Sequence, residues 1–355
     1  MKTESIVERS GAGVPSNTYS VGRVKRNLLK NSWVGTLLTN RDSSNPGDYN
    51  RVYGADAHFQ FRDKLEFDSY ILRSDTPGRS GRNQARRFQT AWKDDERTIS
   101  AEYNSVQPNF NPEVGFVRRR DVEHYAGELA WSPLFRNNRT VRSLNFGTTF
   151  DYFGGSGTGK VETRTQEGTT GIQFWNGSSV NFTVTETFDR LVNALRIPAG
   201  NPHVAILPGD YKFSEYRVRV NTTQSRKIGG NGTFGWGDFY NGKRKTLNGT
   251  LNLKPNYHVN VNLNYDRNQV TLPNGSFTTN LIGTRFTFAF TPRSFLNAFI
   301  QYNADTHQIS SNIRFDFTHR PLSHLYLVYN DRRDTLTGEL LERAFIIKLT
   351  NLFSF

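Results

Sequence analysis

Residues 257–266 read Tyr-His-Val-Asn-Val-Asn-Leu-Asn-Tyr-Asp, and this stretch decides the fold. Its odd positions, from Tyr257 to Tyr265, are apolar or aromatic, and its even positions, from His258 to Asp266, are polar. Side chains of a β-strand alternate between two faces, whereas an amphipathic helix repeats every 3.6 residues. The stretch therefore predicts a strand with one apolar and one polar face.

The same alternation recurs from Thr18 to Phe355, and helical spacing is almost absent. It is clear in Thr246–Leu253 and Val180–Phe188. Further runs lie near 33–40, 52–61, 65–72, 97–105, 122–131, 141–152, 211–223, 232–240, 278–290, 295–303, 309–317, 324–330 and 341–355. The pattern predicts an all-β protein of about 18–20 strands, each near the ~9–11 residues with which a tilted strand crosses a bilayer.

The composition excludes several classes of protein. The chain has 355 residues, of which 27 are Phe, 15 Tyr and 5 Trp, more aromatic surface than a disordered chain carries. It has no cysteine, which excludes disulfides and thiolate metal sites. Mean hydropathy is −0.64 and the longest apolar run is Leu325–Tyr329, too short for a membrane-spanning helix.

Alternation fits a soluble sandwich, a propeller or a membrane barrel, because each has strands with two different faces. Two features favour an antiparallel, up-and-down transmembrane barrel. The polar faces are rich in Asn, Thr and Gln, as expected of a wet lumen. Aromatic residues end the apolar faces, where interfacial girdles belong. These are Tyr257, Tyr265, Tyr329, Phe345 and Phe355.

Loop parity adds a third argument. If Phe355 ends a descending strand, the extracellular connections fall near 41–50, 74–82, 107–120, 153–160, 189–210, 241–244, 271–276, 304–308 and 331–340. The periplasmic ones fall near 27–32, 62–64, 93–96, 132–139, 175–178, 224–229, 254–256, 291–294 and 318–323, with tight-turn sequences such as Asn176-Gly177. The first set holds both of the longest connections, as in outer-membrane barrels.

An odd count of about nineteen strands would start the first one, near Thr18–Arg26, outside the cell, whereas single-chain bacterial barrels have even counts. Residues 1–10 also lack the apolar core of a secretory signal. We therefore expect a barrel domain over 18–355 that lacks one or more N-terminal strands, preceded by an extracellular segment at 1–17.

The last predicted strand, Ala344–Phe355, carries an apolar face and stops at an aromatic residue. This resembles the terminal signal by which the barrel-assembly machinery recognises outer-membrane substrates. Asn351 departs from the apolar pattern of that face. The residues expected to carry the signal are Phe345, Ile347, Leu349, Phe353 and Phe355.

Several segments together resemble an uncharacterised family of bacterial outer-membrane β-barrels that is usually found C-terminal to a family-9 carbohydrate-binding module. The segments are Val21–Leu29, Gly35–Arg41, Asp56–Phe59 and Asn109–Asp121, and the last is the most specific. The resemblance covers essentially the whole chain. It implies a Bacteroidota-type outer membrane and glycan handling, and it agrees with a chain that begins inside the barrel.

The run Gly154–Lys160 fits most of a phosphate-binding loop. That chemistry needs Ser or Thr after the lysine and a helix pointing at the phosphates. Here Val161 follows the lysine, and Glu162–Thr165 continues as a strand. We interpret the run as an extracellular loop.

The seven histidines show no metal-ligand spacing. Asp94-Asp95-Glu96 is predicted to be a polar turn, and Glu66 and Asp68 to share the lumenal face. Sequence cannot show which groups converge, and no enzyme, metal or cofactor is predicted.

The net charge of +13 indicates that the protein meets anionic groups, either in a partner or within the chain. Nucleic acid is not favoured, because the basic residues are spread over loops and polar strand faces rather than clustered with aromatics. They could favour anionic solutes in the lumen, or they could pair with lumenal acids or lipopolysaccharide phosphates. Arg118-Arg119-Arg120 is either a constriction element or a lipopolysaccharide contact. The candidate lumen residues are Arg217, Arg219, Arg285, Arg314, Lys348, His58, Arg118, Arg119 and Arg120.

Taken together, the sequence predicts a non-enzymatic outer-membrane barrel, a passive pore or binding barrel for saccharide-like or anionic solutes. The long connections at 107–120 and 189–210 would set access. Its expected partners are outer-membrane lipid, lipopolysaccharide, the assembly machinery and glycans. The alternatives are a plugged surface barrel that binds glycans without conduction, and a soluble β-rich carbohydrate-binding protein.

Overall fold

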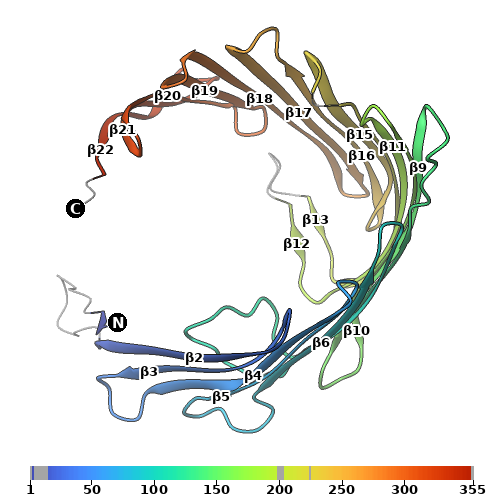
Figure 1. The fold of residues 1–355 in the computed structure, drawn as a ribbon, viewed down its shortest axis with the longest axis vertical. Helices are drawn as coiled ribbons and strands as arrows, with labels where there is room; N and C mark the ends of the chain where they lie inside the picture. Colours follow the sequence, from blue (N-terminus) through green and yellow to red (C-terminus); the bar gives the residue numbers. More distant parts are fainter. Residues whose placement is uncertain (1, 4–14, 198–203, 224, 353–355) are drawn as a thin grey trace. The chain divides into compact units, whose positions relative to one another are not determined.

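The computed structural model describes residues 2–3, 15–197, 204–223 and 225–352. Within these ranges the chain is all-β, and none of its segments is a helix long and apolar enough to span a membrane. Consecutive strands pair antiparallel in an up-and-down order, as Figure 1 shows. The predicted all-β, up-and-down fold is confirmed.

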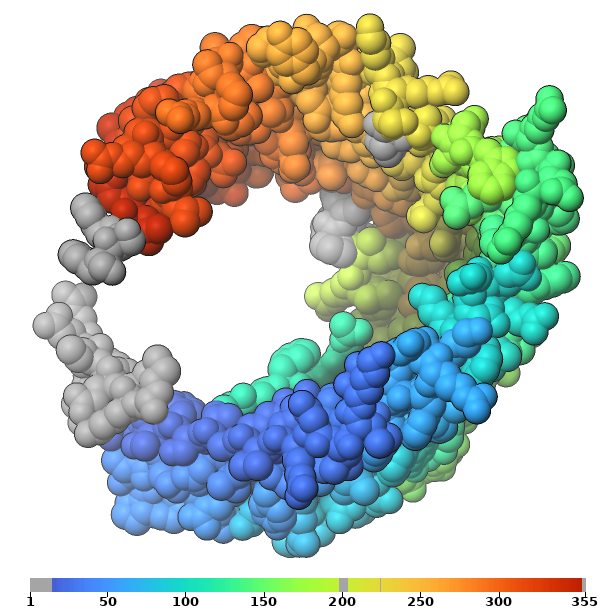
Figure 2. All heavy atoms as spheres, in the orientation of Figure 1, coloured from blue at the N-terminus to red at the C-terminus, as the bar shows by residue number. Residues whose placement is uncertain are grey.

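Nineteen long strands, with the two-residue β1 (Lys2–Thr3), make up the sheet. Neighbours in sequence are neighbours in space, so the colours change gradually from strand to strand in Figure 2. The strands are β2 (Asn17–Leu29), β3 (Ser32–Ser43), β4 (Tyr49–Phe61), β5 (Leu65–Asp75), β6 (Gln84–Lys93), β7 (Arg97–Val106), β8 (Val122–Trp131), β9 (Val141–Gly155), β10 (Val161–Phe174), β11 (Ser179–Leu191), β14 (Gly209–Asn221), β15 (Ile228–Phe239), β16 (Gly242–Leu253), β17 (Val259–Leu272), β18 (Gly275–Thr291), β19 (Ser294–Asn303), β20 (Gln308–Arg320), β21 (Ser323–Asp334) and β22 (Leu340–Thr350).

The chain divides into two compact units, each described here by itself. Unit 1 comprises Met1–Pro133, Phe146–Gly168 and Thr187–Arg190. Unit 2 comprises Leu134–Asn145, Thr169–Glu186 and Leu191–Phe355. β9, β10 and β11 contribute residues to both units.

Strand register keeps the two kinds of side chain on separate faces. In unit 2, Leu251 of β16 lies opposite Leu263 of β17, and the flanking pair Thr250–Asn264 lies on the other face. We call these the apolar face and the polar face of the sheet. Large side chains of the apolar face, such as Leu251 and Leu263, are exposed rather than buried. The apolar face is therefore left exposed along these strands, the reverse of a soluble domain.

Aromatic residues end the apolar face of unit 1 in two rows. Tyr103, Tyr125 and Tyr152 are adjacent in register near one end of β7–β9, with ring centroids 5.1 and 6.0 Å apart. Trp131 and Phe146 lie opposite each other near the other end, 5.9 Å apart. Tyr125 and Trp131 are six residues apart on β8, roughly 20 Å along the strand.

Buried apolar side chains among the described residues form two small clusters, one in each unit. The unit 1 cluster contains Val52, Ala85, Val106, Phe110 and Val122. The unit 2 cluster contains Val204, Ile206, Val270 and Leu272. Both lie where a long connection folds onto strand ends, and neither runs along the length of the sheet.

These two connections are 107–121 and 192–208, the longest in the described chain, as the loop parity predicts. The second contains the short strands β12 (Leu195–Arg196) and β13 (Ala205–Ile206), which the sequence did not predict. Val204 and Ile206 of this segment pack on Val270 and Leu272 of β17.

Several turns have the predicted chemistry. Gly177 has a φ of 85°, the left-handed conformation that an Asn-Gly turn requires. Thr291 and Ser294 share a side-chain hydrogen bond of 2.7 Å. After the connection 156–160 the chain enters β10 at Val161, so the phosphate-loop-like run joins two strands as predicted.

The C-terminal strand is shorter than predicted. β22 ends at Thr350, and the predicted signal residues Phe353 and Phe355 lie outside the described residues. Phe345, Ile347 and Leu349 share the exposed apolar face as predicted. At the other end, Lys2 and Thr3 pair with β2, and residues 1 and 4–14 of the predicted N-terminal segment are outside the described residues. Asn17, the last residue of that predicted segment, already belongs to β2.

Candidate functional site

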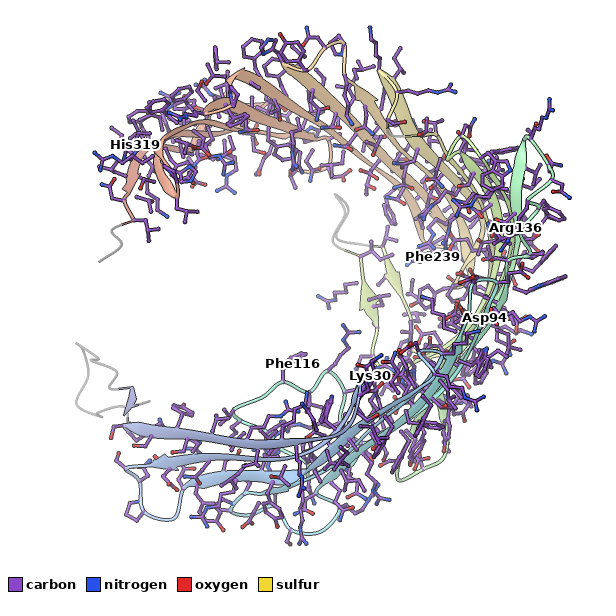
Figure 3. All side chains as sticks on the ribbon, in the orientation of Figure 1. Lys30, Asp94, Phe116, Arg136, Phe239 and His319 are labelled. Carbon is purple, nitrogen blue, oxygen red and sulfur yellow. The ribbon has the colours of Figure 1, made fainter. Side chains whose placement is uncertain are left out.

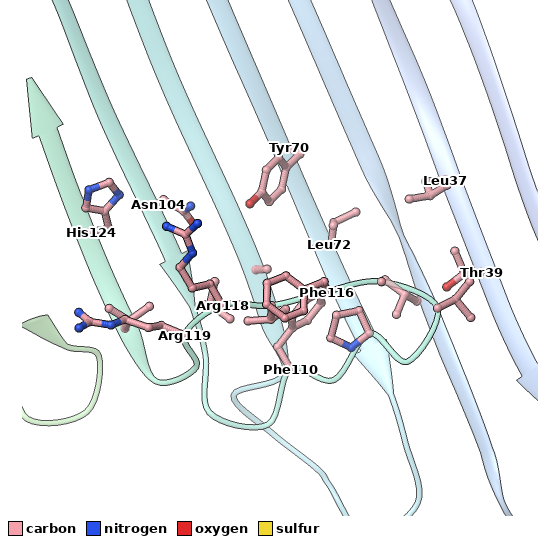
Figure 4. A pocket seen from close by; sticks show the side chains of 18 of the residues that line it. Leu37, Thr39, Tyr70, Leu72, Asn104, Phe110, Phe116, Arg118, Arg119 and His124 are labelled. Atoms are coloured by element: carbon pink, nitrogen blue, oxygen red, sulfur yellow. The ribbon is translucent and has the colours of Figure 1, made fainter. Parts of the chain in front are cut away.

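A pocket of unit 1 lies on the polar face of β3–β9, beneath the connection 107–121, which we call the capping loop (Figure 4). It has a volume of about 530 Å³. The strands contribute side chains that share one face because they are paired in register. They are Leu37, Thr39, Val52, Tyr70, Leu72, Ala85, Glu102, Asn104, Val106, Val122, His124 and Phe153.

Phe110 is the apolar anchor of the capping loop. Its side chain is only 2% exposed and packs among Val52, Ala85, Val106 and Val122. These four residues are small or β-branched, so they leave room for one aromatic ring between strands and loop. Burial of this ring holds the start of the loop on the sheet.

Two buried polar residues of the sheet bind the backbone of the loop. Asn50 Nδ2 donates to the carbonyl of Asn111 (2.6 Å), and Asn50 Oδ1 accepts from the Glu113 amide (3.2 Å). Ser74 Oγ accepts from the Asn111 amide (2.9 Å). Asn50 and Ser74 are fully buried, so each would leave unpaired polar atoms if the loop moved away.

An ion-pair network ties the middle of the loop to β3. Arg41 pairs with Glu113 of the loop and with Asp48 of the neighbouring turn. Arg41 itself is nearly buried. Its guanidinium, which donates hydrogen bonds to the Asp48 carboxylate, holds the pKa of Asp48 below its ordinary value.

The three consecutive arginines have three different environments. Arg120 Nη2 donates to Asn111 Oδ1 (2.7 Å) and so braces the loop internally. Arg119 lies over the ring of Phe153, 4.9 Å from its centroid. Arg118 lines the pocket and forms no ion pair within the described residues. The run thus lies against the polar face of unit 1.

Phe116 is 88% exposed although it belongs to an anchored loop. Its ring projects from the loop, as Figure 3 shows, and it lines the pocket in Figure 4. An exposed aromatic ring beside hydrogen-bonding groups offers a flat surface on which an apolar ligand face can stack.

The polar wall of the pocket is a hydrogen-bonded set on β6–β9. Arg87 Nη2 donates to Glu102 Oε2 (2.8 Å). His124 Nε2 lies 2.5 Å from Asp151 Oδ1, and its ring stacks on Phe153 with centroids 4.1 Å apart. These contacts fix the side chains in place before any ligand arrives.

Asn104 is the exception in this wall. Its Oδ1 is buried and accepts no hydrogen bond from the described residues, and the side chain lines the pocket. Buried polar atoms are normally satisfied, so this unpaired acceptor behind the pocket surface is an irregularity of the wall.

The remaining candidate of unit 1, His58, lies on the same polar face. Its Nδ1 is 2.8 Å from Asp68 Oδ1, because the two residues are opposite each other on β4 and β5. Glu66 accepts from Gln60 (3.1 Å) on that face, as its predicted facing requires. His58 is therefore occupied by a carboxylate and does not line the capped pocket.

The five basic candidates of unit 2 lie on its polar face: Arg217, Arg219, Arg285, Arg314 and Lys348. None of them pairs with a carboxylate in the part of the chain that the structure describes. Arg219 donates to the Thr233 hydroxyl (3.3 Å), and Arg285 and Arg314 lie over the aromatic rings of Phe299 and Tyr326. Pairing with acids of the same face, one of the explanations considered for the basic charge, therefore does not apply to these five residues.

Sequence reasoning missed the polar wall made by Tyr70, Glu102, Asn104 and His124. These residues come from three strands, and nothing in a single sequence indicates that they meet. The capping loop was indicated, because its run Asn109–Asp121 is the most specific part of the family resemblance. No cluster of three His, Asp or Glu residues among the described positions could hold a metal ion.

The sequence matches no protein-family model and no curated protein. Solved structures with a similar arrangement include OmpT, an outer-membrane protein of Vibrio cholerae, in its in-vitro folded form, with a TM-score of 0.38, 10% identity and 96% of both chains covered. Another is the siderophore receptor PirA of Acinetobacter baumannii, with a TM-score of 0.35, 9% identity, and 94% of this chain and 69% of that one covered.

Proposed function

We propose that the chain forms the β-barrel of an outer-membrane protein that binds and passes saccharide-like or anionic solutes along its polar face. The observation that carries the proposal is the reversed distribution of side chains. The apolar face is exposed along the strands, while the polar face carries Asn, Thr, Arg and acids. In water this arrangement would expose a large apolar surface, whereas in a bilayer it is the stable one.

The aromatic rows support the same placement. Tyr125 and Trp131 mark the two ends of the apolar stretch of β8, roughly 20 Å apart along the strand. A transmembrane barrel has an apolar band about 25 Å tall, bordered by aromatic girdles at both interfaces. In this proposal the apolar face contacts outer-membrane lipid and lipopolysaccharide, and β22 is the strand recognised by the assembly machinery.

The pocket under the capping loop supports a saccharide-like solute. A sugar ring has apolar C–H faces and a rim of hydroxyl groups. Phe116 offers an exposed ring for stacking, while the Glu102 carboxylate offers an acceptor for hydroxyl donors. The polar wall is held by Arg87 and Asp151, so it is preorganised for such a ligand.

A second function, a plugged barrel that binds glycans without conduction, is favoured by one observation. The capping loop is anchored to the polar face by Phe110, Asn50 and Arg41, so it is a fixed obstacle rather than a loose connection. Both functions use the same pocket, and they differ only in whether ions pass it.

Planar-bilayer recording of the protein folded in detergent separates the two. We expect stepwise conductance that is reduced by neutral oligosaccharides, because a sugar bound at Phe116 would narrow the path. Phe116→Ala should weaken this block by about tenfold, whereas Phe67→Ala, an exposed ring of the apolar face, should not change it. Sugar binding without conductance would favour the plugged barrel. The absence of both conductance and sugar binding would contradict the proposed function.

A further inference from the structure

A groove on the polar face of unit 2 has the chemistry of an anion site. It has a volume of about 510 Å³ and crosses β14–β17. Its walls contain almost only charged, amide and hydroxyl side chains. They are Glu215, Arg217, Arg219, Asn231, Thr233, Arg244, Thr246, Asn248, Gly249, Thr250, Asn264 and Asp266.

Both carboxylates of the groove already have partners. Glu215 of β14 forms an ion pair with Arg244 of β16. Asp266 accepts a hydrogen bond of 2.5 Å from Asn248 Nδ2. The Glu215 carboxylate is neutralised by Arg244, and with Asp266 the groove holds three arginines against two carboxylates, which leaves it net positive.

Glycine makes the first of these pairs possible. Glu215 reaches over Gly237 of β15, which lies between it and Arg244 in the strand register, and Gly235 is the next residue of β15 on the same face. A Cβ atom on Gly235 would stand 2.5 Å from Thr246 Oγ1 and 3.2 Å from Glu215 Oε1. The absence of side chains here leaves space for the Glu215–Arg244 ion pair. Arg244 is therefore paired, and two other arginines of the groove remain available to bind an anion.

Those two are Arg217 and Arg219, two residues apart on one face of β14, so their Cα atoms are roughly 7 Å apart. Arg217 lies opposite Gly235, which has no side chain to cover it. Arg219 donates only to the Thr233 hydroxyl (3.3 Å). Within the described residues neither has a carboxylate partner, and both line the groove.

We propose that Arg217 and Arg219, with the hydroxyl and amide groups of Thr233 and Asn231, bind a tetrahedral oxyanion, the sulfate or phosphate group of an acidic saccharide. This inference rests on the proposed function and names its substrate class. Guanidinium groups form charge-assisted, often bidentate hydrogen bonds with oxyanions. The three terminal oxygens of such an ester point in three directions and can accept from both arginines and from a neutral donor at once, whereas the acceptor sites of a carboxylate lie in one plane.

The test is calorimetric titration of the detergent-folded protein with glucose 6-sulfate, glucose 6-phosphate, glucuronate, glucose and inorganic sulfate. We expect the sulfate and phosphate esters to bind at least about tenfold more tightly than glucose or glucuronate. Inorganic sulfate that binds as tightly as the esters would support the site and assign it to the free anion. Glucuronate that binds as tightly as the esters would overturn the tetrahedral preference.

Variants locate the site. Arg217→Gln and Arg219→Gln should each weaken ester binding about tenfold and leave glucose binding unchanged. Arg267→Gln is the matched control, since Arg267 is an exposed arginine of β17 on the opposite face. Heat-modifiable migration on gels verifies that each variant is folded.

The outcomes also separate this inference from the proposed function. Conductance and sugar block without any preference for esters would overturn the anion site and leave the barrel proposal standing. A protein that neither conducts nor binds neutral sugars, but binds the esters and loses that binding in Arg217→Gln, would support the anion site and overturn the proposed function.

Discussion

The polar faces of the two units are built from the same kinds of residue but use their charges differently. In unit 1 five cations are matched to acids of neighbouring strands or of the capping loop: Arg23 with Asp56, Arg41 with Glu113, Arg87 with Glu102, His58 with Asp68 and His124 with Asp151. In unit 2 Arg244 is matched to Glu215 and His324 to Asp316, but five other cations of the polar face have no acid partner among the described residues. Matched charges stiffen a wall and hold a loop, whereas unmatched ones remain available to a solute.

The long loops of the two units also differ in the kind of contact that holds them. The unit 1 loop is tied down by polar contacts as well as by Phe110. The 192–208 segment of unit 2 packs mainly through apolar residues, Val204 and Ile206 on Val270 and Leu272. The comparison indicates a preorganised pocket in unit 1 and a charged groove in unit 2.

The largest expected effect is the loss of the loop anchor. Phe110→Ala should destabilise the docked capping loop by about 3–5 kcal/mol, because it removes a buried ring and leaves a cavity. Limited proteolysis within 107–121 should then become fast. Phe116→Ala is the control, since that ring is exposed and its loss should leave the loop resistant. Equal resistance in both variants would contradict the anchoring role of Phe110.

The next effect concerns the matched charges. Arg41→Gln should weaken loop docking by about 1–3 kcal/mol, because Glu113 loses a charged hydrogen-bond partner at a nearly buried site. Arg51→Gln removes an exposed pair with Asp42 at 3.9 Å and should change docking by less than about 0.5 kcal/mol. Hydrogen exchange of the loop amides measures both. Similar effects of the two substitutions would show that burial does not set the strength of these pairs.

Whether a structural feature can be predicted from the sequence depends on how far apart along the chain the interacting residues lie. Alternation predicted the strand at Tyr257–Asp266, which the structure places at Val259–Leu272, because the facing of side chains is a local property of the chain. The ends of a strand are predicted less well from alternation: β22 stops at Thr350, whereas the alternation predicted a strand to the C-terminus. The partners of Asn104 or Arg41 depend on register and loop docking between distant segments, and one sequence does not encode them in any readable pattern.

The unmatched cations should set ion selectivity. Removing two of them in the double variant Arg217→Gln and Arg219→Gln should lower the anion-over-cation permeability ratio by roughly two- to threefold. Reversal potentials in a salt gradient measure the ratio. Arg23→Gln is the matched control, since that arginine is paired with Asp56. A larger shift in the control would mean that pairing does not decide which cations act on the solute.

The smallest effect is the pH dependence of the Arg41 network. Asp48 has a pKa lowered from its ordinary value of 3.8, so its contact with Arg41 stabilises the turn at pH values above that and loses its effect as the pH falls through the lowered pKa. Protease resistance of the 44–48 turn should be flat from neutral pH to about pH 4 and fall below it. Asp48→Asn should remove this acid step. A step at higher pH in the unaltered protein would implicate another group.

The placement of the two faces can be measured most directly by spin labelling, because the sequence has no native cysteine. Leu263→Cys and Asn264→Cys place labels on adjacent residues of β17 that belong to opposite faces. In lipid vesicles we expect the label at 263 to be accessible to oxygen and the label at 264 to a water-soluble nickel complex. Nickel accessibility at both positions would contradict an apolar face immersed in lipid, and with it the barrel function.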